Sequence, residues 1–172
     1  MAAELAGGRG RGARYSLSPP SLLNISQGTR LVLPSTNGST LTLGTGATPT
    51  LAGCLRNYRA VALAAQKYGR RISVIPAGER WGDGSLRPAF EDWLGAGAII
   101  SQLNGNLSPE ARAAVAAFRH ADAETELLIR QCGSGRELIT RGFEEDIVLA
   151  AALDVSACVP TLVKGAYVHA AG

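Results

Sequence analysis

The chain has 172 residues, of which 46% are apolar, and its 17 basic and 14 acidic side chains give a formal net charge of +3. This length and composition predict one globular domain with a substantial core and exclude a disordered chain. The sequence shows neither an apolar run of the ~18 residues that a membrane span needs nor the apolar core of a secretory signal at its start. It also lacks the mixed basic and aromatic stripe of a nucleic-acid-binding protein.

The cysteines and arginines indicate the compartment and the kind of ligand. The sequence has three cysteines, Cys54, Cys132 and Cys158, which is an odd number, and none of them has C-x-x-C spacing. We therefore expect a cytoplasmic protein without disulfides or structural zinc. Arginine supplies 15 of the 17 basic residues, and its planar guanidinium suits phosphate and carboxylate oxygens. A GC-rich genome is the favoured explanation for the bulk of this bias, so a functional role is expected only for arginines beside glycine-rich turns.

Strands and helices alternate along the predicted chain. Apolar runs ending in a proline or cysteine predict strands at residues 29–34, 49–54 and 71–76. Apolar periodicity predicts helices at 57–69, 87–103, 108–121, 123–132, 135–142 and 143–153, followed by a hairpin around Gly165. The alternation predicts one α/β domain over residues 1–172, with a largely parallel sheet between two helical layers.

Each predicted strand is followed by a polar loop: "PSTNGST", "CLRNYR" and "PAGERWGDGS". In open α/β sheets such loops meet beyond the carboxyl ends of the strands, where helix N-termini favour anions. We therefore expect the three loops to form one crevice, with Gly38 either at positive φ or leaving room for an anion oxygen. The alternative is that Ser-Thr-Asn-Gly is only a turn with a helix cap.

Acidic residues lie near two of these loops. Glu79 and Asp83 follow the strand at 71–76, and Glu91 and Asp92 are adjacent near the start of a predicted helix. Carboxylates in such places suit Mg²⁺ shared with a phosphate, although Glu91 could equally form an ordinary surface pair with Arg87. The small residues at 95–98, "GAGA", would let another backbone or a ligand come close.

Several motifs together resemble the 2-phosphosulfolactate phosphatase family, in order from about Leu5 to Tyr167. These are "LAGGRGRG", "YSLSPPSLL", "VLPSTNGST", "CLRNYRAVA", "AGERWGDGSLRPAFEDWLGAGAII", "SPEARAA" and "CGSGRELITRGFEEDIVLAAALDVSACVP". The resemblance implies a three-layer α/β/α phosphatase fold that uses Mg²⁺. It also implies hydrolysis of (2R)-2-phospho-3-sulfolactate to 3-sulfolactate and phosphate, a step in coenzyme M biosynthesis.

The resemblance also implies roles for individual residues. Glu79, Glu91 and Asp92 are expected to bind metal or position water, whereas Glu145 and Asp146 are read as acids of a first helical turn. Anion binding is expected from Arg9, Ser35, Thr36, Asn37, Gly38, Ser39, Arg56, Asn57, Arg80, Ser134, Gly135 and Arg136.

Three functional alternatives stay open. Family members usually begin with a further segment that includes the first strand and an Asp-Val-x-x-x-Thr-like motif, so the chain is expected to be N-terminally incomplete. It could be the phosphatase itself, a phosphatase for another small anionic phospho-hydroxy acid, or a non-catalytic remnant that binds anions or a partner. An exposed sheet edge leaves homo-oligomer formation open.

Overall fold

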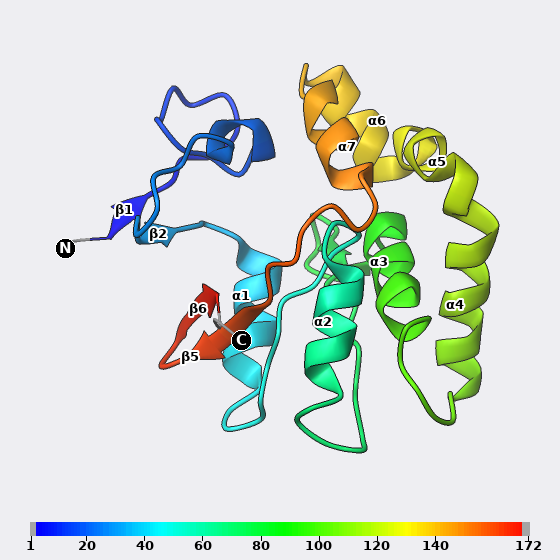
Figure 1. Cartoon of the computed structure of the whole chain (residues 1–172). Helices are drawn as coiled ribbons and strands as arrows, with labels where there is room; N and C mark the ends of the chain where they lie inside the picture. The colour runs from blue at the N-terminus through cyan, green and yellow to red at the C-terminus, as the bar shows by residue number, and fades with distance from the viewer. Residues whose placement is uncertain (1–2, 170–172) are drawn as a thin grey trace.

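The computed structural model describes residues 3–169, except for the side chains of Thr36 and Asp122. Helices alternate with three short two-stranded sheets, which makes the fold α/β (Figure 1). The helices are α1 (Thr36–Gly44), α2 (Tyr58–Ala65), α3 (Phe90–Ile100), α4 (Pro109–Ala121), α5 (Thr125–Gln131), α6 (Gly133–Thr140), α7 (Glu144–Ala151), and the 3₁₀ turns η1 (Pro19–Leu22) and η2 (Asp122–Glu124). The strands are β1 (Glu4–Leu5), β2 (Leu31–Val32), β3 (Glu79–Arg80), β4 (Leu86–Arg87), β5 (Pro160–Val163) and β6 (Ala166–His169).

The main core lies between the helices. Leu94 of α3 and Ile147 of α7 are completely buried, and the rings of Tyr58 and Phe118 pack with centroids 5.6 Å apart. Helices α3 and α4 run side by side, with α5, α6 and α7 gathered beyond their ends (Figure 1). Their closest approach is at Gly97, where a Cβ would lie 2.1 Å from the carbonyl oxygen of Ala114. The prediction that "GAGA" admits a neighbouring backbone is thereby confirmed.

The helices predicted from periodicity are confirmed, with shorter bounds in most cases. The helix at 108–121 begins at Pro109 as predicted, because Ser108 accepts hydrogen bonds from the backbone N–H groups of Ala111 and Arg112. Helix α2 ends at Ala65 rather than at residue 69. The hairpin around Gly165 is also confirmed, since β5 and β6 pair in antiparallel register and Gly165 has φ 78°.

The predicted pairing of the strands is mostly wrong. Only Leu31 and Val32 of the segment 29–34 form a strand, which pairs in parallel with β1. Segment 49–54 makes a single bridge, from Leu51 to Thr161, and it is antiparallel. Residues 71–76 form no strand. A β-prone run becomes a strand only when a partner backbone lies beside it, and apolar alternation carries no information about that partner.

The loop expected after residue 34 is instead the start of helix α1. Ser35 is its N-cap residue and Thr36–Gly44 are helical, so Gly38 lies in the first turn and does not have a positive φ. This excludes the first of the two alternatives expected for Gly38, the positive φ. Small hydroxyl residues favour turns because their side chains compete with helix formation locally, but here the segment after Ser35 is helical.

The amino-terminal segment is attached to α7 through Asp146. Arg9 donates from Nε to one carboxylate oxygen at 2.7 Å, and the Ser18 hydroxyl donates to the other. The Asp146 side chain is 3% exposed. Asp146 does lie in the first turn of α7, as predicted, but its role is to hold residues 9–18 against the helix.

Candidate functional site

The start of α1, the loop at 77–86 and the start of α3 meet at a group of carboxylates. Asn37, at the start of α1, donates from its side-chain nitrogen to Oε2 of Glu79 at 2.9 Å. The backbone N–H of Gly78 donates to Oδ2 of Asp92, in the first turn of α3, at 2.8 Å. The loops at 34–40 and 77–86 therefore meet as predicted. These contacts join residues 42 and 14 positions apart in the sequence.

The same group extends to helix α6 through Glu91. The thiol of Cys132, the N-cap residue of α6, lies 3.6 Å from Oε2 of Glu91. Arg87 forms an ion pair with Glu137 of α6, and its charge also interacts with those of Glu79 and Glu91. The expected surface pair between Glu91 and Arg87 is thus replaced by a pair between Arg87 and Glu137. We call Asn37, Glu79, Glu91 and Asp92 the carboxylate site.

Electrostatics at the carboxylate site disfavour an unpaired negative charge. Burial, followed by the charges of Glu91 and Glu79, raises the pKa of Asp92 to about 6 against the opposing hydrogen bond from Gly78. Burial likewise raises the pKa of the Cys132 thiol, so Cys132 is not a thiolate nucleophile at neutral pH. A cation beside these carboxylates would offset the repulsion.

Asp92 predicts a specific pH dependence of stability. Because its folded pKa of about 6 exceeds the ordinary 3.8, the fold favours the protonated form, and this contribution is lost as the pH rises through about 6. A shift of this size corresponds to at most about 3 kcal/mol, and partial exposure of the side chain reduces the expected loss to about 1–2 kcal/mol. Urea unfolding from pH 4 to pH 7 should show this loss in the parent.

The variant Asp92→Asn should lack this loss of stability. Asp83→Asn is the matched control, since Asp83 is exposed and binds only Ser85 within its own turn. Parallel pH profiles for the parent and Asp92→Asn would contradict the assignment.

The donors fit Mg²⁺ better than a softer metal. Within the described residues, no group of three or more His, Cys, Asp or Glu side chains is arranged to hold a metal. Mg²⁺ needs only one or two protein carboxylates, because water and substrate phosphate complete its octahedron. Glu79, Glu91 and Asp92 carry hard oxygen atoms, and burial together with the charges of Glu91 and Glu79 disfavours the negative charge of Asp92.

Other predicted anion-binding side chains are engaged elsewhere. Arg9 binds Asp146, and Arg56 donates to the carbonyl of Leu149 at 2.6 Å. Asn57 is buried and bridges the N–H of Cys54 and the carbonyl of Cys158, both at 2.8 Å. The loop at 54–58 therefore contacts α7 and the segment at 154–158 that follows it, rather than the carboxylate site. Arg80 binds the carbonyl of Gly84 within its hairpin.

The predicted anion site at the start of α6 is also occupied by protein contacts. The N–H of Gly135 donates to the Cys132 sulfur at 3.4 Å, and a Cβ at Gly135 would lie 1.8 Å from the carbonyl oxygen of Ile129. Gly135 is therefore required for the close packing of α6 on α5. Ser134 is half-buried and Arg136 exposed. Ser35 and Ser39 are exposed at the start of α1, and the side chain of Thr36 lies outside the described structure.

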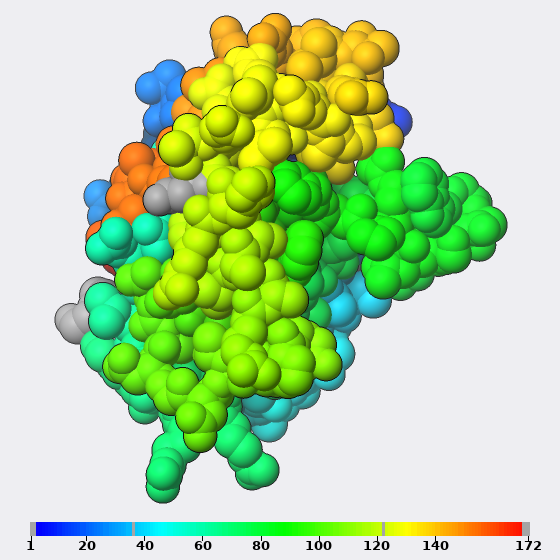
Figure 2. Space-filling model, turned by 90° about the vertical axis from the view of Figure 1, so that its right-hand side faces the viewer, coloured from blue at the N-terminus to red at the C-terminus, as the bar shows by residue number. Residues whose placement is uncertain are grey.

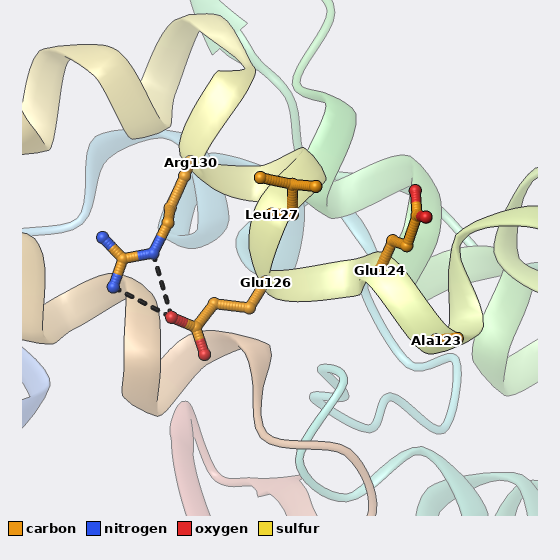
Figure 3. Close-up of a pocket in the computed structure, with 5 residues that line it drawn as sticks. All are labelled: Ala123, Glu124, Glu126, Leu127 and Arg130. Atoms are coloured by element: carbon orange, nitrogen blue, oxygen red, sulfur yellow. Dashed lines mark hydrogen bonds and ion pairs between the residues drawn. The ribbon is translucent and has the colours of Figure 1, made fainter.

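Two shallow hollows lie on the helical side of the molecule. One, of about 280 Å³, is lined by Arg136, Glu137, Thr140 and Arg141. The other, of about 370 Å³, lies along η2 and α5, where Arg130 pairs with Glu126 (Figure 3). Figure 2 shows this face, with the β3–β4 hairpin projecting at the right. The second hollow includes none of the predicted site residues.

Sequence reasoning missed Gly78, Cys132 and the pairing role of Asp146. Gly78 and Cys132 act through a backbone N–H and a thiol, which have no distinctive sequence pattern. Asp146 had a usable signal in the sequence, because it lies three residues from both Phe143 and Leu149 on one face of the predicted helix.

Comparison with known proteins places the chain in a family. Residues 1–165 match a family model described as 2-phosphosulpholactate phosphatase. The chain belongs to the 2-phosphosulfolactate phosphatase family. It is 32% identical over 139 residues to the 2-phosphosulfolactate phosphatase of Methanothermobacter thermautotrophicus, covering 81% of this chain and 58% of that protein. Probable 2-phosphosulfolactate phosphatases of Thermotoga petrophila and Gloeobacter violaceus are 30% and 33% identical, covering 82% and 77% of this chain and 60% and 55% of theirs.

This member of the 2-phosphosulfolactate phosphatase family spans about three-fifths of the length of these relatives. No described helix combines the length and apolar character that crossing a bilayer requires. The family resemblance derived from the sequence motifs is thus confirmed.

Proposed function

We propose that the chain provides a phosphatase site that hydrolyses (2R)-2-phospho-3-sulfolactate to 3-sulfolactate and phosphate, in the cytoplasm and as part of coenzyme M biosynthesis. The carboxylate site is the observation that carries this proposal. Residues from α1, the β3 loop and α3 converge there, in a chain whose relatives are named for this substrate. We further propose that the complete fold is a three-layer α/β/α sandwich.

Mg²⁺ is the proposed cofactor, held by one or two of Glu79, Glu91 and Asp92. When bound, it would neutralise phosphate charge and polarise the phosphorus centre. The remaining carboxylate positions a water molecule for attack. Asn37 orients Glu79 through its hydrogen bond, and the start of α1 presents backbone N–H groups to the phosphate. Arg87 adds positive charge near Glu79 and Glu91.

A second candidate function is favoured by the limited span of the chain. Because it covers about three-fifths of its relatives, it could bind anions or a partner without turnover, or act on a different small phospho-hydroxy acid. Phosphate release from 2-phospho-3-sulfolactate with Mg²⁺, compared with 2-phospholactate, separates these functions. Turnover of the sulfonate substrate supports the first proposal. Tight phosphate binding without turnover supports the anion-binding remnant.

Calorimetric titration tests the proposed metal independently of turnover. Phosphate should strengthen Mg²⁺ binding, because the anion completes the coordination sphere that the carboxylates leave open. Asp92→Asn should weaken Mg²⁺ binding, whereas Asp83→Asn should leave it unchanged. Stoichiometric binding of zinc by cysteine would contradict the proposed donor set.

Replacing Asn37 with alanine tests the role of the α1 start. The side-chain nitrogen of Asn37 has a second hydrogen beside the one donated to Glu79, and losing its hydrogen bond to a charged phosphate costs about 1.5–3 kcal/mol, or roughly 10- to 150-fold in phosphate affinity. Ser35→Ala is the matched control, since Ser35 is the N-cap residue and its side chain makes no capping hydrogen bond. Calorimetry should show weak phosphate binding for Asn37→Ala, and thermal melting should show a lowered Tm, because the bond to Glu79 is lost in the absence of ligand as well. If Asn37→Ala binds phosphate as tightly as the parent but has a lower Tm, Asn37 only stabilises the turn.

A further inference from the structure

Arg87 lies between the carboxylate site and helix α6. In the β3–β4 pair it stands directly opposite Glu79, and cross-strand partners of this kind project from the same face of a hairpin. Its guanidinium nevertheless donates to Glu137 of α6, from Nη1 to Oε1 and from Nη2 to Oε2 at 3.3 Å. The charges of Glu79 and Glu91 also act on it, but among the described residues its one ion pair is with Glu137. Arg87 therefore faces two groups of carboxylates and is bonded to one of them.

The pair between Arg87 and Glu137 is easily exchanged. The Glu137 side chain is 55% exposed, and exposed ion pairs contribute little stability because water screens both charges. The hydrogen bond from Arg87 and, to a smaller extent, the charge of Arg141 lower the pKa of Glu137 against the opposing effect of burial. If Arg87 left, Glu137 would keep both water and the charge of Arg141. Its release of Arg87 would therefore strand no buried charge.

Trp81 on the neighbouring strand provides a natural probe of the position of Arg87. The guanidinium carbon of Arg87 lies 5.3 Å from the centroid of the Trp81 ring, a distance at which the cation is attracted to the ring face. Both residues belong to the hairpin that projects in Figure 2. Because indole emission depends on nearby charge, a movement of Arg87 should change the fluorescence of Trp81.

We propose that Arg87 binds the phosphate of a substrate held at the carboxylate site, and that Glu137 competes with this anion for Arg87. This inference rests on the proposed function, because it requires an anion beside Glu79. A phosphate offers the same pair of acceptor oxygens as the Glu137 carboxylate and carries more charge, so it can replace Glu137 in both hydrogen bonds. Glu137 thus sets how tightly the free site takes up an anion.

Calorimetric titration with inorganic phosphate in the presence of Mg²⁺ tests the competition. Glu137→Gln should strengthen phosphate binding by about two- to fivefold, the range that a weak exposed ion pair allows. Arg87→Gln should weaken phosphate binding by about tenfold or more. Arg87→Lys keeps the charge but loses the planar fork, so its affinity should lie between those of the parent and Arg87→Gln.

Two controls separate competition from a general effect of charge. Glu144→Gln breaks an exposed pair with Arg130, between α5 and α7, and should leave phosphate binding unchanged. In the Arg87→Gln background, Glu137→Gln should give no gain, because no arginine is left to release. An equal gain with and without Arg87 would overturn the proposal, since Glu137 would then act through its charge alone. Unchanged or weaker binding in Glu137→Gln itself would also overturn it.

Fluorescence gives a readout that a purely structural role of Arg87 would not move. In a Trp93→Phe background, which removes the second tryptophan, phosphate should change the emission of Trp81, and Arg87→Gln should abolish this change. If phosphate binds with the expected ranking of variants but 2-phospho-3-sulfolactate is not hydrolysed, the proposed hydrolysis fails and the role of Arg87 stands. If hydrolysis occurs and Arg87→Gln binds phosphate as tightly as the parent, only the role of Arg87 fails. Absence of phosphate binding in the parent would overturn both.

Discussion

Gly97→Ala is expected to lower the free energy of unfolding by about 3 kcal/mol or more. The added Cβ would lie 2.1 Å from the carbonyl oxygen of Ala114, 2.7 Å from its carbonyl carbon and 3.0 Å from the Cβ of Phe118. The first two atoms belong to the backbone of α4, so the clash is relieved only if α3 and α4 move apart. Such a movement opens a close-packed core.

Gly95→Ala is the matched control on the same helix. Its Cβ would meet only the backbone nitrogen of Leu55, at 4.0 Å, and alanine favours a helix over glycine by up to about 1 kcal/mol. Urea unfolding should therefore show Gly97→Ala strongly destabilised and Gly95→Ala unchanged or slightly stabilised. Equal stabilities for the two variants would mean that α3 and α4 do not pack at Gly97.

The packing at Gly97 also bears on the carboxylate site. Glu91 and Asp92 lie in the first turn of α3, and Gly97 is in the same helix. A shift of α3 away from α4 would move both carboxylates relative to Gly78, whose N–H binds Asp92. We therefore expect Gly97→Ala to weaken Mg²⁺ binding as well, while Gly95→Ala does not.

Asp146→Ala is expected to destabilise the fold by about 2–4 kcal/mol. The substitution removes the partner of Arg9, whose side chain is 26% exposed, and of the Ser18 hydroxyl. Because Arg9 can partly regain water, the expected loss lies below the largest values for buried ion pairs. The amino-terminal segment should detach first, since this carboxylate holds both Arg9 and Ser18 of that segment.

Urea unfolding and limited proteolysis measure the two parts of this expectation. Asp146→Ala should expose residues 9–18 to cleavage at protease concentrations that leave the parent intact. Glu145→Ala is the control, because Glu145 is exposed in the same helical turn and should change stability by less than about 0.5 kcal/mol. Parent-like stability and protection in Asp146→Ala would show that the buried contacts of Asp146 do not hold the segment.

The positions of most helices could be predicted from local signals in the sequence. Ser108 and Pro109 define the start of α4 through local capping and a preset φ, and both effects act within one turn. The small residues at 95–98 predicted a close approach, which Gly97 makes. The motif order also identified the family over nearly the whole chain, as the match to residues 1–165 confirms.

Only the tertiary structure decided which strands pair and which polar residues meet. Leu51 pairs antiparallel with Thr161, and residues 71–76 pair with nothing described, because strand formation depends on a distant backbone that local propensity does not specify. Asn37 reaches Glu79, whereas Asn57, in an equally polar loop, is used between Cys54 and Cys158. The sequence listed the polar groups, and long-range packing selected which of them lie together, since hydrogen bonds between remote side chains form only after the chain has brought them within about 3 Å.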